Sequence, residues 1–288
     1  MPPSRRHLGQ FALALFTADR LLRPRPAAAA PAALEALLAP SARAWPRWAA
    51  HDPKGGAIDH AAWSGILARL VRPWPDGSTR VAWRAATPAI RAELRGAIAA
   101  MEAVPVSRHP RAEQFAFWAN LYNALTLRVV LDHYPVASIR DIDISPGLFA
   151  SGPWGARLAV VEGEPITLND IEHRILRPLW ADPRVHYAVN CASIGCPDLL
   201  PRAFTGAGLE AQLDRAASGF VNHPRAVTPG PEGVVLSSLY NWFAEDFSGA
   251  QGVLAHLQRH AAAPLLAVLA TRPAIAGYRY DWGLNDAI

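Results

Sequence analysis

The segment RVHYAVNCASIGCPDLLP, residues 184–201, holds both cysteines of the chain, beside a histidine, an asparagine and a serine. In cysteine chemistry the nucleophile is the thiolate, and a histidine or a polar pocket activates it. Asn190 and Ser193 flank Cys191 with hydrogen-bonding groups, so Cys191 is the first candidate nucleophile, with His186 as its candidate base. This interpretation predicts cysteine-dependent acyl transfer or hydrolysis on a small peptide-like or thiol-containing substrate.

The second cysteine leaves other interpretations open. Cys196 is itself a candidate nucleophile if Pro197 and Asp198 open a short helix, because a helix N-terminus lowers the pKa of a thiol. A Cys-x4-Cys pair can also form a small-loop disulfide in an oxidising compartment, or two buried and inert thiols. A zinc site is the remaining alternative, and its candidate ligands are His173, His186, Cys191 and Cys196.

The residues before the first cysteine alternate as in a β-strand. Apolar and polar or small positions follow one another in Val185, His186, Tyr187, Ala188, Val189 and Asn190. We therefore predict a strand that ends near Asn190, followed by a loop up to Cys196. In an extended strand His186 and Cys191 are about 16 Å apart and face opposite sides, so they meet only if the chain bends. His173 is the alternative base.

A predicted helix that follows Thr167 carries a carboxylate among apolar residues. Thr167 and Asp170 form the Thr-x-x-Asp variant of a capping box at its start. One face of this helix is an apolar stripe that includes Glu172. Its residues follow one another at spacings of four, three and four: Leu168, Glu172, Ile175 and Leu179. A carboxylate in this apolar stripe needs a partner or takes up a proton. Glu172 is therefore expected either to pair with an arginine or to orient the catalytic histidine.

The segment QFAFWANLYNALTLRVV, residues 114–130, is apolar on nearly all sides and predicts a buried helix. Asn120 and Asn123 lie three residues apart and project from one face of it. A buried amide without partners costs about 1–3 kcal/mol, so both side chains need hydrogen-bond partners. Two interpretations stay open: the amides lock the helix to a neighbouring loop, or they line the site as binding residues together with Asn190 and Ser193.

Residues 31–288 are expected to form one globular domain of the α+β class, mostly helices packed on a small, largely antiparallel sheet. Further helices are predicted at 59–71, 87–103, 209–220 and 252–260, and short strands at 139–144, 158–161 and 234–236. The composition, 51% hydrophobic and 18% charged, is typical of a soluble globular protein with a sizeable core. No stretch is long and apolar enough to predict a transmembrane span.

Residues 1–30 have the pattern of an export signal. A basic Ser4-Arg5-Arg6 precedes the apolar run FALALF, and Ala27–Ala30 offer a small-residue cleavage site, which predicts a periplasmic or secreted protein. The Arg5-Arg6 pair resembles a twin-arginine signal. These residues carry five arginines and one aspartate, and the rest of the chain has 23 basic and 23 acidic residues. The excess positive charge thus belongs to the leader, and no basic stripe predicts nucleic-acid binding.

Four motifs together resemble a known family. They are FWANLYNALTLRVVLDHYP, LNDIEHRILR, DPRVHYAVNCASIGCPDL and YNWFAEDF, within residues 115–246. In these motifs the chain is similar to the bacterial, exported branch of domain-of-unknown-function family 547. That family supplies no assigned activity. Its signature positions are occupied here by Asn120, Asn123, Asn169, Glu172, His173, His186, Asn190, Cys191, Ser193 and Cys196.

The apolar helix followed by an H-x-A segment also resembles papain-like and transglutaminase-like folds. Those folds place the nucleophilic cysteine at the start of the helix, where this chain has Asn120 and Asn123 instead. The leading prediction is therefore Cys191 as nucleophile, His186 as base and Glu172 as its orienting group, without metal or cofactor. The alternative is a non-catalytic module that binds a small molecule or peptide and holds a structural disulfide between the two cysteines.

Overall fold

The computed structural model describes residues 36–147 and 152–288. These residues lie in a compact unit that spans residues 31–288. The leader expected at residues 1–30 lies outside the described residues, so export stays a prediction. Within residues 36–147 and 152–288, no helix combines the length and the apolar character that a membrane span requires.

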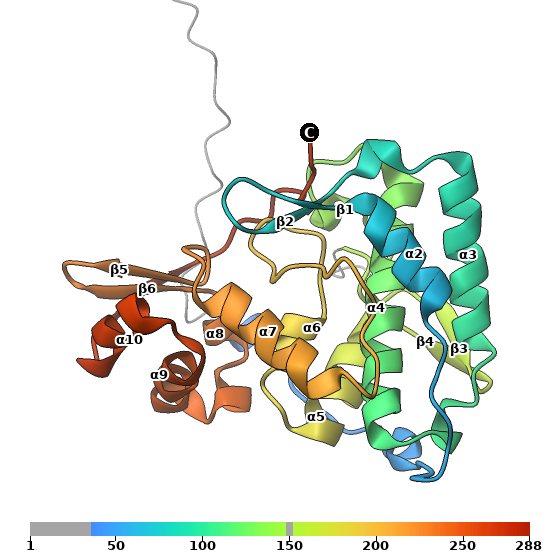
Figure 1. The fold of residues 1–288 in the computed structure, drawn as a ribbon, viewed down its shortest axis with the longest axis horizontal. Coiled ribbons are helices and arrows are strands. Elements are labelled where there is room, and N and C mark those ends of the chain that lie inside the picture. The colour runs from blue at the N-terminus through green and yellow to red at the C-terminus, as the bar shows by residue number, and fades with distance from the viewer. Residues whose placement is uncertain (1–35, 148–151) are drawn as a thin grey trace, which may run out of the picture. The chain divides into compact units, whose positions relative to one another are not determined.

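Helices make up most of the regular structure, which confirms the predicted class (Figure 1). The α-helices are α2 (Ala61–Leu70), α3 (Pro88–Glu102), α4 (Arg111–His133), α5 (Arg177–Trp180), α6 (Val185–Ala188), α7 (Leu209–Val221), α8 (Leu239–Trp242), α9 (Gly249–His260) and α10 (Ala263–Ala270). The 3-10 turns are η1 (Pro46–Ala49), η2 (Trp83–Ala85), η3 (Val106–Arg108), η4 (Ile139–Asp141) and η6 (Ala244–Phe247), and η5 (Asp170–Leu176) is a π-helical segment.

The strands form three small sheets in the described residues, whereas the sequence predicted one. Their bounds are β1 (Val71–Pro73), β2 (Thr79–Val81), β3 (Ala159–Val161), β4 (Glu164–Ile166), β5 (Val227–Gly230), β6 (Gly233–Ser237) and β7 (Ile275–Arg279). β1 pairs with β2 and β3 with β4, both antiparallel, while β5-β6-β7 combines an antiparallel and a parallel pair.

Helix α4 is the central element of the larger core, as its apolar sequence predicts. It packs against α3 and against η5, and it is buried along nearly its whole length (Figure 1). Helix α3 begins as predicted, because the Thr87 hydroxyl accepts a hydrogen bond from the Ile90 N–H at 3.3 Å and Pro88 takes the first helical position. These two helices fix the frame against which the cysteine segment lies.

Two hydrophobic clusters meet at α6. Val185 and Ala188 belong to the larger cluster around α4, and Tyr187 belongs to the smaller one formed with α7, α9 and the β5-β6-β7 sheet. His186 is only 2% exposed. All four residues of this short helix are buried, and their side chains belong to both clusters and to the polar network around His186.

Two predicted strands are wrong. The segment expected as a strand at 185–189 contains the helix α6. A run of six alternating residues is a weak signal, and burial on all sides overrides it. The strand expected at 139–144 is the 3-10 turn η4, closed by a capping box between Ser138 and Asp141.

The helix that follows Thr167 begins as predicted but is wider than an α-helix. The Thr167 hydroxyl accepts the Asp170 N–H at 3.0 Å, and the Asp170 carboxylate accepts the Thr167 N–H at 3.0 Å. Within η5 the Arg177 N–H donates to the Glu172 carbonyl five residues back. The wider turn buries both Glu172 and His173, although α-helical spacing predicts that His173 points away.

Candidate functional site

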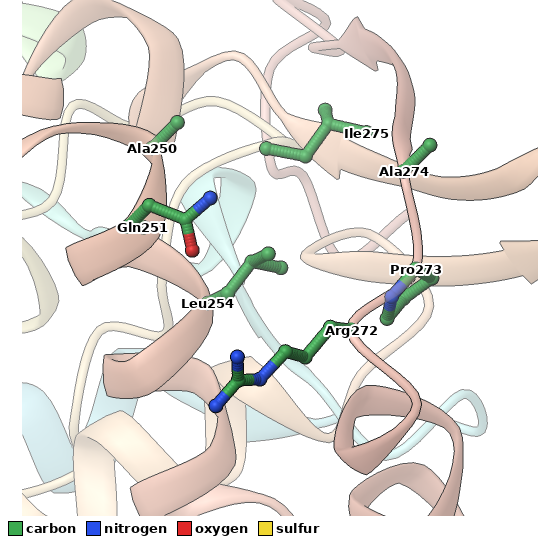
Figure 2. Close-up of a pocket in the computed structure, with 7 residues that line it drawn as sticks. All are labelled: Ala250, Gln251, Leu254, Arg272, Pro273, Ala274 and Ile275. Atoms are coloured by element: carbon green, nitrogen blue, oxygen red, sulfur yellow. The ribbon is translucent and has the colours of Figure 1, made fainter.

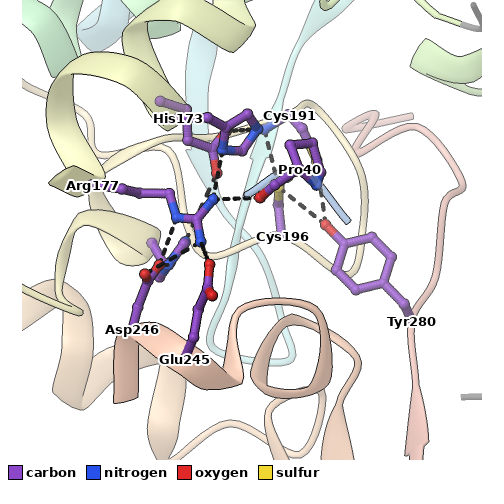
Figure 3. A network of polar contacts seen from close by, with 10 residues as sticks. Pro40, His173, Arg177, Cys191, Cys196, Glu245, Asp246 and Tyr280 are labelled. Atoms are coloured by element: carbon purple, nitrogen blue, oxygen red, sulfur yellow. Dashed lines mark hydrogen bonds and ion pairs between the residues drawn. The ribbon is translucent and has the colours of Figure 1, made fainter. Parts of the chain in front are cut away.

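The sulfur atoms of Cys191 and Cys196 lie 2.6 Å apart, and both cysteines are free (Figure 3). The Cys191 backbone N–H donates to Cys196 Sγ at 3.0 Å. The Tyr280 hydroxyl lies 3.2 Å from Cys196 Sγ and 3.3 Å from Cys191 Sγ, and the Ser193 hydroxyl lies 3.2 Å from Cys191 Sγ. Hydrogen-bonding groups thus surround the pair of sulfurs, as the polar neighbours in the sequence suggested.

These contacts favour one negative charge on the pair. Burial raises the pKa of Cys196, but hydrogen bonds from the Cys191 thiol, the Tyr280 hydroxyl and the Cys191 N–H outweigh it and lower this pKa to about 6. The hydrogen bond to Cys196, together with burial, raises the pKa of Cys191 well above its ordinary value. At neutral pH the two sulfurs therefore share one proton, with the thiolate on Cys196.

The cause of the low pKa differs from the one predicted. No helix follows Cys196, so the expected N-cap position is wrong, and hydrogen bonds rather than a helix terminus stabilise the thiolate. The two thiols also differ in exposure. Cys196 is 5% exposed, whereas Cys191 is partly open to solvent. Cys191 is therefore the more exposed of the two cysteines.

Asn123 and Asn190 hold the cysteine loop, and Asn120 holds the segment at Phe204. Asn123 donates to the Ala188 carbonyl and accepts the Asn190 N–H, both at 2.8 Å. The Asn190 side chain in turn donates to the Pro197 carbonyl at 2.7 Å. Asn120 makes the same pair of bonds to the backbone of Phe204, at 2.8 and 2.9 Å. This is the predicted interpretation in which buried amides lock the helix to a neighbouring loop.

The C-terminal segment holds the same loop from the other side. The Ile194 N–H donates to the Gly283 carbonyl at 2.7 Å, and the Gly195 N–H donates to the Asp281 carbonyl at 2.8 Å. A Cβ atom at Gly195 would lie 2.8 Å from the Asp281 nitrogen, so only glycine allows this approach. Together with α4, these contacts fix the position of both sulfurs.

A second buried network lies around Glu172. Its carboxylate oxygens are 3.8 Å from His186 Nδ1 and 4.0 Å from His173 Nε2. Burial raises the pKa of Glu172 to about 7, although Arg177 and a hydrogen bond from Tyr122 oppose this. Burial, with the charge of Arg177, lowers the pKa of His173 to about 3, so His173 is neutral.

Arg177 is the cation of this network, and its side chain is fully buried (Figure 3). It donates to Asp246 at 2.6 and 3.2 Å, to Glu245 at 3.1 Å and to the Pro40 carbonyl at 2.6 Å. Its Nη1 lies 3.0 Å from His173 Nδ1. Burial raises the pKa of Asp246, but hydrogen bonds from His186 and Arg177 outweigh it and lower the pKa to about 2. Asp246 is therefore a carboxylate at any physiological pH.

His186 belongs to this network and not to the thiol pair. Its Nε2 lies 2.7 Å from Asp246 Oδ2, and its ring stacks on Phe243 at 4.4 Å. Burial lowers the pKa of His186, so we assign a neutral ring that donates Nε2–H to Asp246. Among the hydrogen bonds of the described residues, none joins His186 to a sulfur. The expected contact between His186 and Cys191 is absent, whereas Glu172 and His186 lie together as predicted.

Tyr122 connects the two networks. Burial raises its pKa, and the negative charges of Glu172, Cys191 and Cys196 raise it further, which requires all three groups to lie nearby. The charge of Cys196 likewise raises the pKa of Glu172. Whether Glu172 is protonated therefore depends on the charge of the thiol pair.

Sequence reasoning missed Tyr122, Arg177 and Tyr280 as site residues. Tyr122 lies in the motif between Asn120 and Asn123, and Arg177 lies four residues after His173, so both spacings were available as signals. Tyr280 carried no local signal, because only the fold brings it to the cysteines.

A separate pocket lies between α9 and the start of β7 (Figure 2). Its lining is Ala250, Gln251, Leu254, Arg272, Pro273, Ala274 and Ile275. The lining has a single ionisable side chain and no nucleophile, so the pocket offers less chemistry than the thiol pair. Within the part of the chain that the structure describes, no group of three or more His, Cys, Asp or Glu is arranged to hold a metal ion, and the zinc alternative gains no support.

Comparison with known proteins places part of the chain in a family. Residues 106–221 match the model of the family described as "Protein of unknown function, DUF547", which confirms the family resemblance for that segment. No curated protein and no solved structure matches the chain, so the papain-like and transglutaminase-like resemblance gains no support. The matched segment holds the cysteines and Glu172, whereas Asp246 and Tyr280 lie beyond it.

Proposed function

We propose that this chain, whose family match assigns no activity, is a cysteine-dependent hydrolase or acyl transferase that acts on a small peptide-like or thiol-containing substrate. The observation that carries the proposal is the contact between the sulfur of Cys191, the more exposed of the two cysteines, and the thiolate of Cys196 at 2.6 Å. In this arrangement Cys196 acts as the base, the role predicted from the sequence for His186.

The reaction follows from this contact. Cys191 passes its proton to Cys196 and attacks the acyl carbon, which forms a thioester and expels the leaving group. The proton now on Cys196 goes to the leaving group, which restores the thiolate. Water or a thiol acceptor then cleaves the thioester. The hydroxyls of Ser193 and Tyr280, both hydrogen-bonded at Cys191 Sγ, are the donors available to the carbonyl oxygen as it becomes negative.

The buried network around Glu172 lies near the thiol pair and can influence its protonation. Glu172, with a pKa of about 7, can hold or release a proton at neutral pH. Tyr122 lies between Glu172 and the thiols, and His186 contacts Glu172 on its other side. We assign His186, Asp246 and Arg177 as positioning residues, because they act on the thiols only through Glu172.

The test is a pre-steady-state experiment with p-nitrophenyl acetate and the reduced full chain. We expect a burst of p-nitrophenol equal to the protein concentration and an acetyl group on the peptide that contains Cys191. Cys191→Ala should abolish the burst. Cys196→Ala should slow acylation about tenfold at pH 6, because an isolated thiol with a pKa of about 8.5 is mostly protonated there, while its greater nucleophilicity offsets only part of that loss.

The double variant Cys191→Ala, Cys196→Ala is the control for acetylation of other side chains. A burst that persists in Cys191→Ala, or an acetyl group that maps to another residue, would contradict the proposal.

A further inference from the structure

The two sulfurs are already close to bonding distance. A disulfide has a sulfur separation of about 2.05 Å, and here the free sulfurs lie 2.6 Å apart. The loop that carries them is fixed by Asn123 on one side and by the segment after Tyr280 on the other. Formation of a Cys191–Cys196 bond therefore brings the sulfurs about half an ångström closer together.

The hydrogen bonds around the two sulfurs stabilise the reduced dithiol, so that the Cys191–Cys196 disulfide is readily reduced again. The Cys191 N–H and the Tyr280 hydroxyl both donate to Cys196 Sγ, and these hydrogen bonds are strongest when that sulfur is a thiolate. They weaken when the sulfur enters a disulfide. A dithiol whose reduced form is stabilised in this way yields a disulfide that is readily reduced.

We propose that Cys191 and Cys196 form a redox centre that exchanges two electrons with external disulfides and thiols. The accessible Cys191 attacks a disulfide R–S–S–R, forms Cys191–S–S–R and releases one R–S⁻. Cys196, buried behind it, then attacks Cys191 Sγ, closes the internal disulfide and releases the second R–S⁻. The one proton that the pair holds at neutral pH ends on one leaving group, and water protonates the other, so the chain loses two electrons and R–S–S–R gains them.

The exposure of the sulfurs sets the order of these steps. Cys196 is 5% exposed and cannot meet an external disulfide directly, whereas it is in contact with Cys191. Cys191 is thus the entry thiol and Cys196 the resolving thiol. The centre uses the same sulfurs as the proposed acyl transfer but does not depend on it.

The test uses glutathione disulfide with the reduced full chain, followed by intact mass spectrometry. The chain has two cysteines, so every product is readily assigned. Wild type should lose two hydrogens, accumulate no glutathione adduct, and return to the starting mass with dithiothreitol. Cys196→Ser should accumulate one adduct on Cys191, and Cys191→Ser should react at least tenfold more slowly.

A variant of the hydrogen-bond donor tests reversibility. Tyr280→Phe should shift the equilibrium toward the disulfide about tenfold, while the matched control Tyr278→Phe on β7 should not. Stable adducts on wild type, reaction only after unfolding, or equal rates for Cys191→Ser and wild type would overturn the redox centre. Stable adducts on wild type would leave the acetylation burst of Cys191 intact, so the redox centre can fail while the acyl transfer stands.

Discussion

Replacement of Arg177 by methionine is expected to lower the free energy of unfolding by about 3–5 kcal/mol. The Arg177 side chain is fully buried and holds Asp246 through two hydrogen bonds, at 2.6 and 3.2 Å. Without the guanidinium, neutral His186 is the hydrogen-bond partner that the described residues leave to the Asp246 carboxylate. Urea denaturation at pH 7 measures the change.

Arg69→Met is the matched control for this prediction. Arg69 pairs with Glu93 on the surface, where exposed ion pairs contribute little to stability. The urea denaturation curve of Arg69→Met should stay close to that of wild type. If Arg177→Met were no more destabilised than Arg69→Met, the buried network around Asp246 would not be a stabilising feature of the fold.

Replacement of Asn123 by alanine should cost about 2–6 kcal/mol and should also change the thiols. Two buried backbone groups, the Ala188 carbonyl and the Asn190 N–H, lose their partner, at about 1–3 kcal/mol each. Since Asn190 precedes Cys191, the loop loses its fixed position and the hydrogen bonds to Cys196 Sγ weaken. The apparent pKa of the reactive thiol should therefore rise, measured by iodoacetamide alkylation.

Asn120→Ala is the matched control, because it should lower the stability of the fold without changing the geometry of the cysteine loop. Asn120 makes an equivalent pair of hydrogen bonds, but to the backbone of Phe204 and not to the cysteine loop. It should lose a similar amount of stability and leave the thiol pKa unchanged. Equal shifts of the thiol pKa in the two variants would mean that general loosening, and not the loop contact, sets thiol reactivity.

The sequence predicted those elements whose signals are local and strong. Helix α3 has both Thr87 as its cap and Pro88 at its first position, and α4 is apolar over many turns. The prediction of a strand at α6 was wrong because the conformation of its four residues depends on contacts with residues distant in the sequence. His186 meets Asp246 and Tyr187 meets His256 at 2.9 Å, and these contacts override a short alternating pattern.

In the candidate site, too, only the contacts between residues close in the sequence could be predicted. Cys191, Ser193 and Cys196 are close in sequence, so their meeting could be predicted, and the apolar stripe marked Glu172 as buried. Tyr280 is more than eighty residues from either cysteine. No spacing in one sequence reports a contact of that kind.

The most direct test of the shared-proton thiol pair is the rate of iodoacetamide alkylation against pH on the reduced native chain. Only the thiolate reacts, so the rate should rise with pH through an apparent pKa of about 6. Cys191→Ser and Cys196→Ser should each move that midpoint up toward the roughly 8.5 of an isolated thiol. A wild-type midpoint at or above 8.5, or a midpoint that neither substitution moves, would contradict the pair.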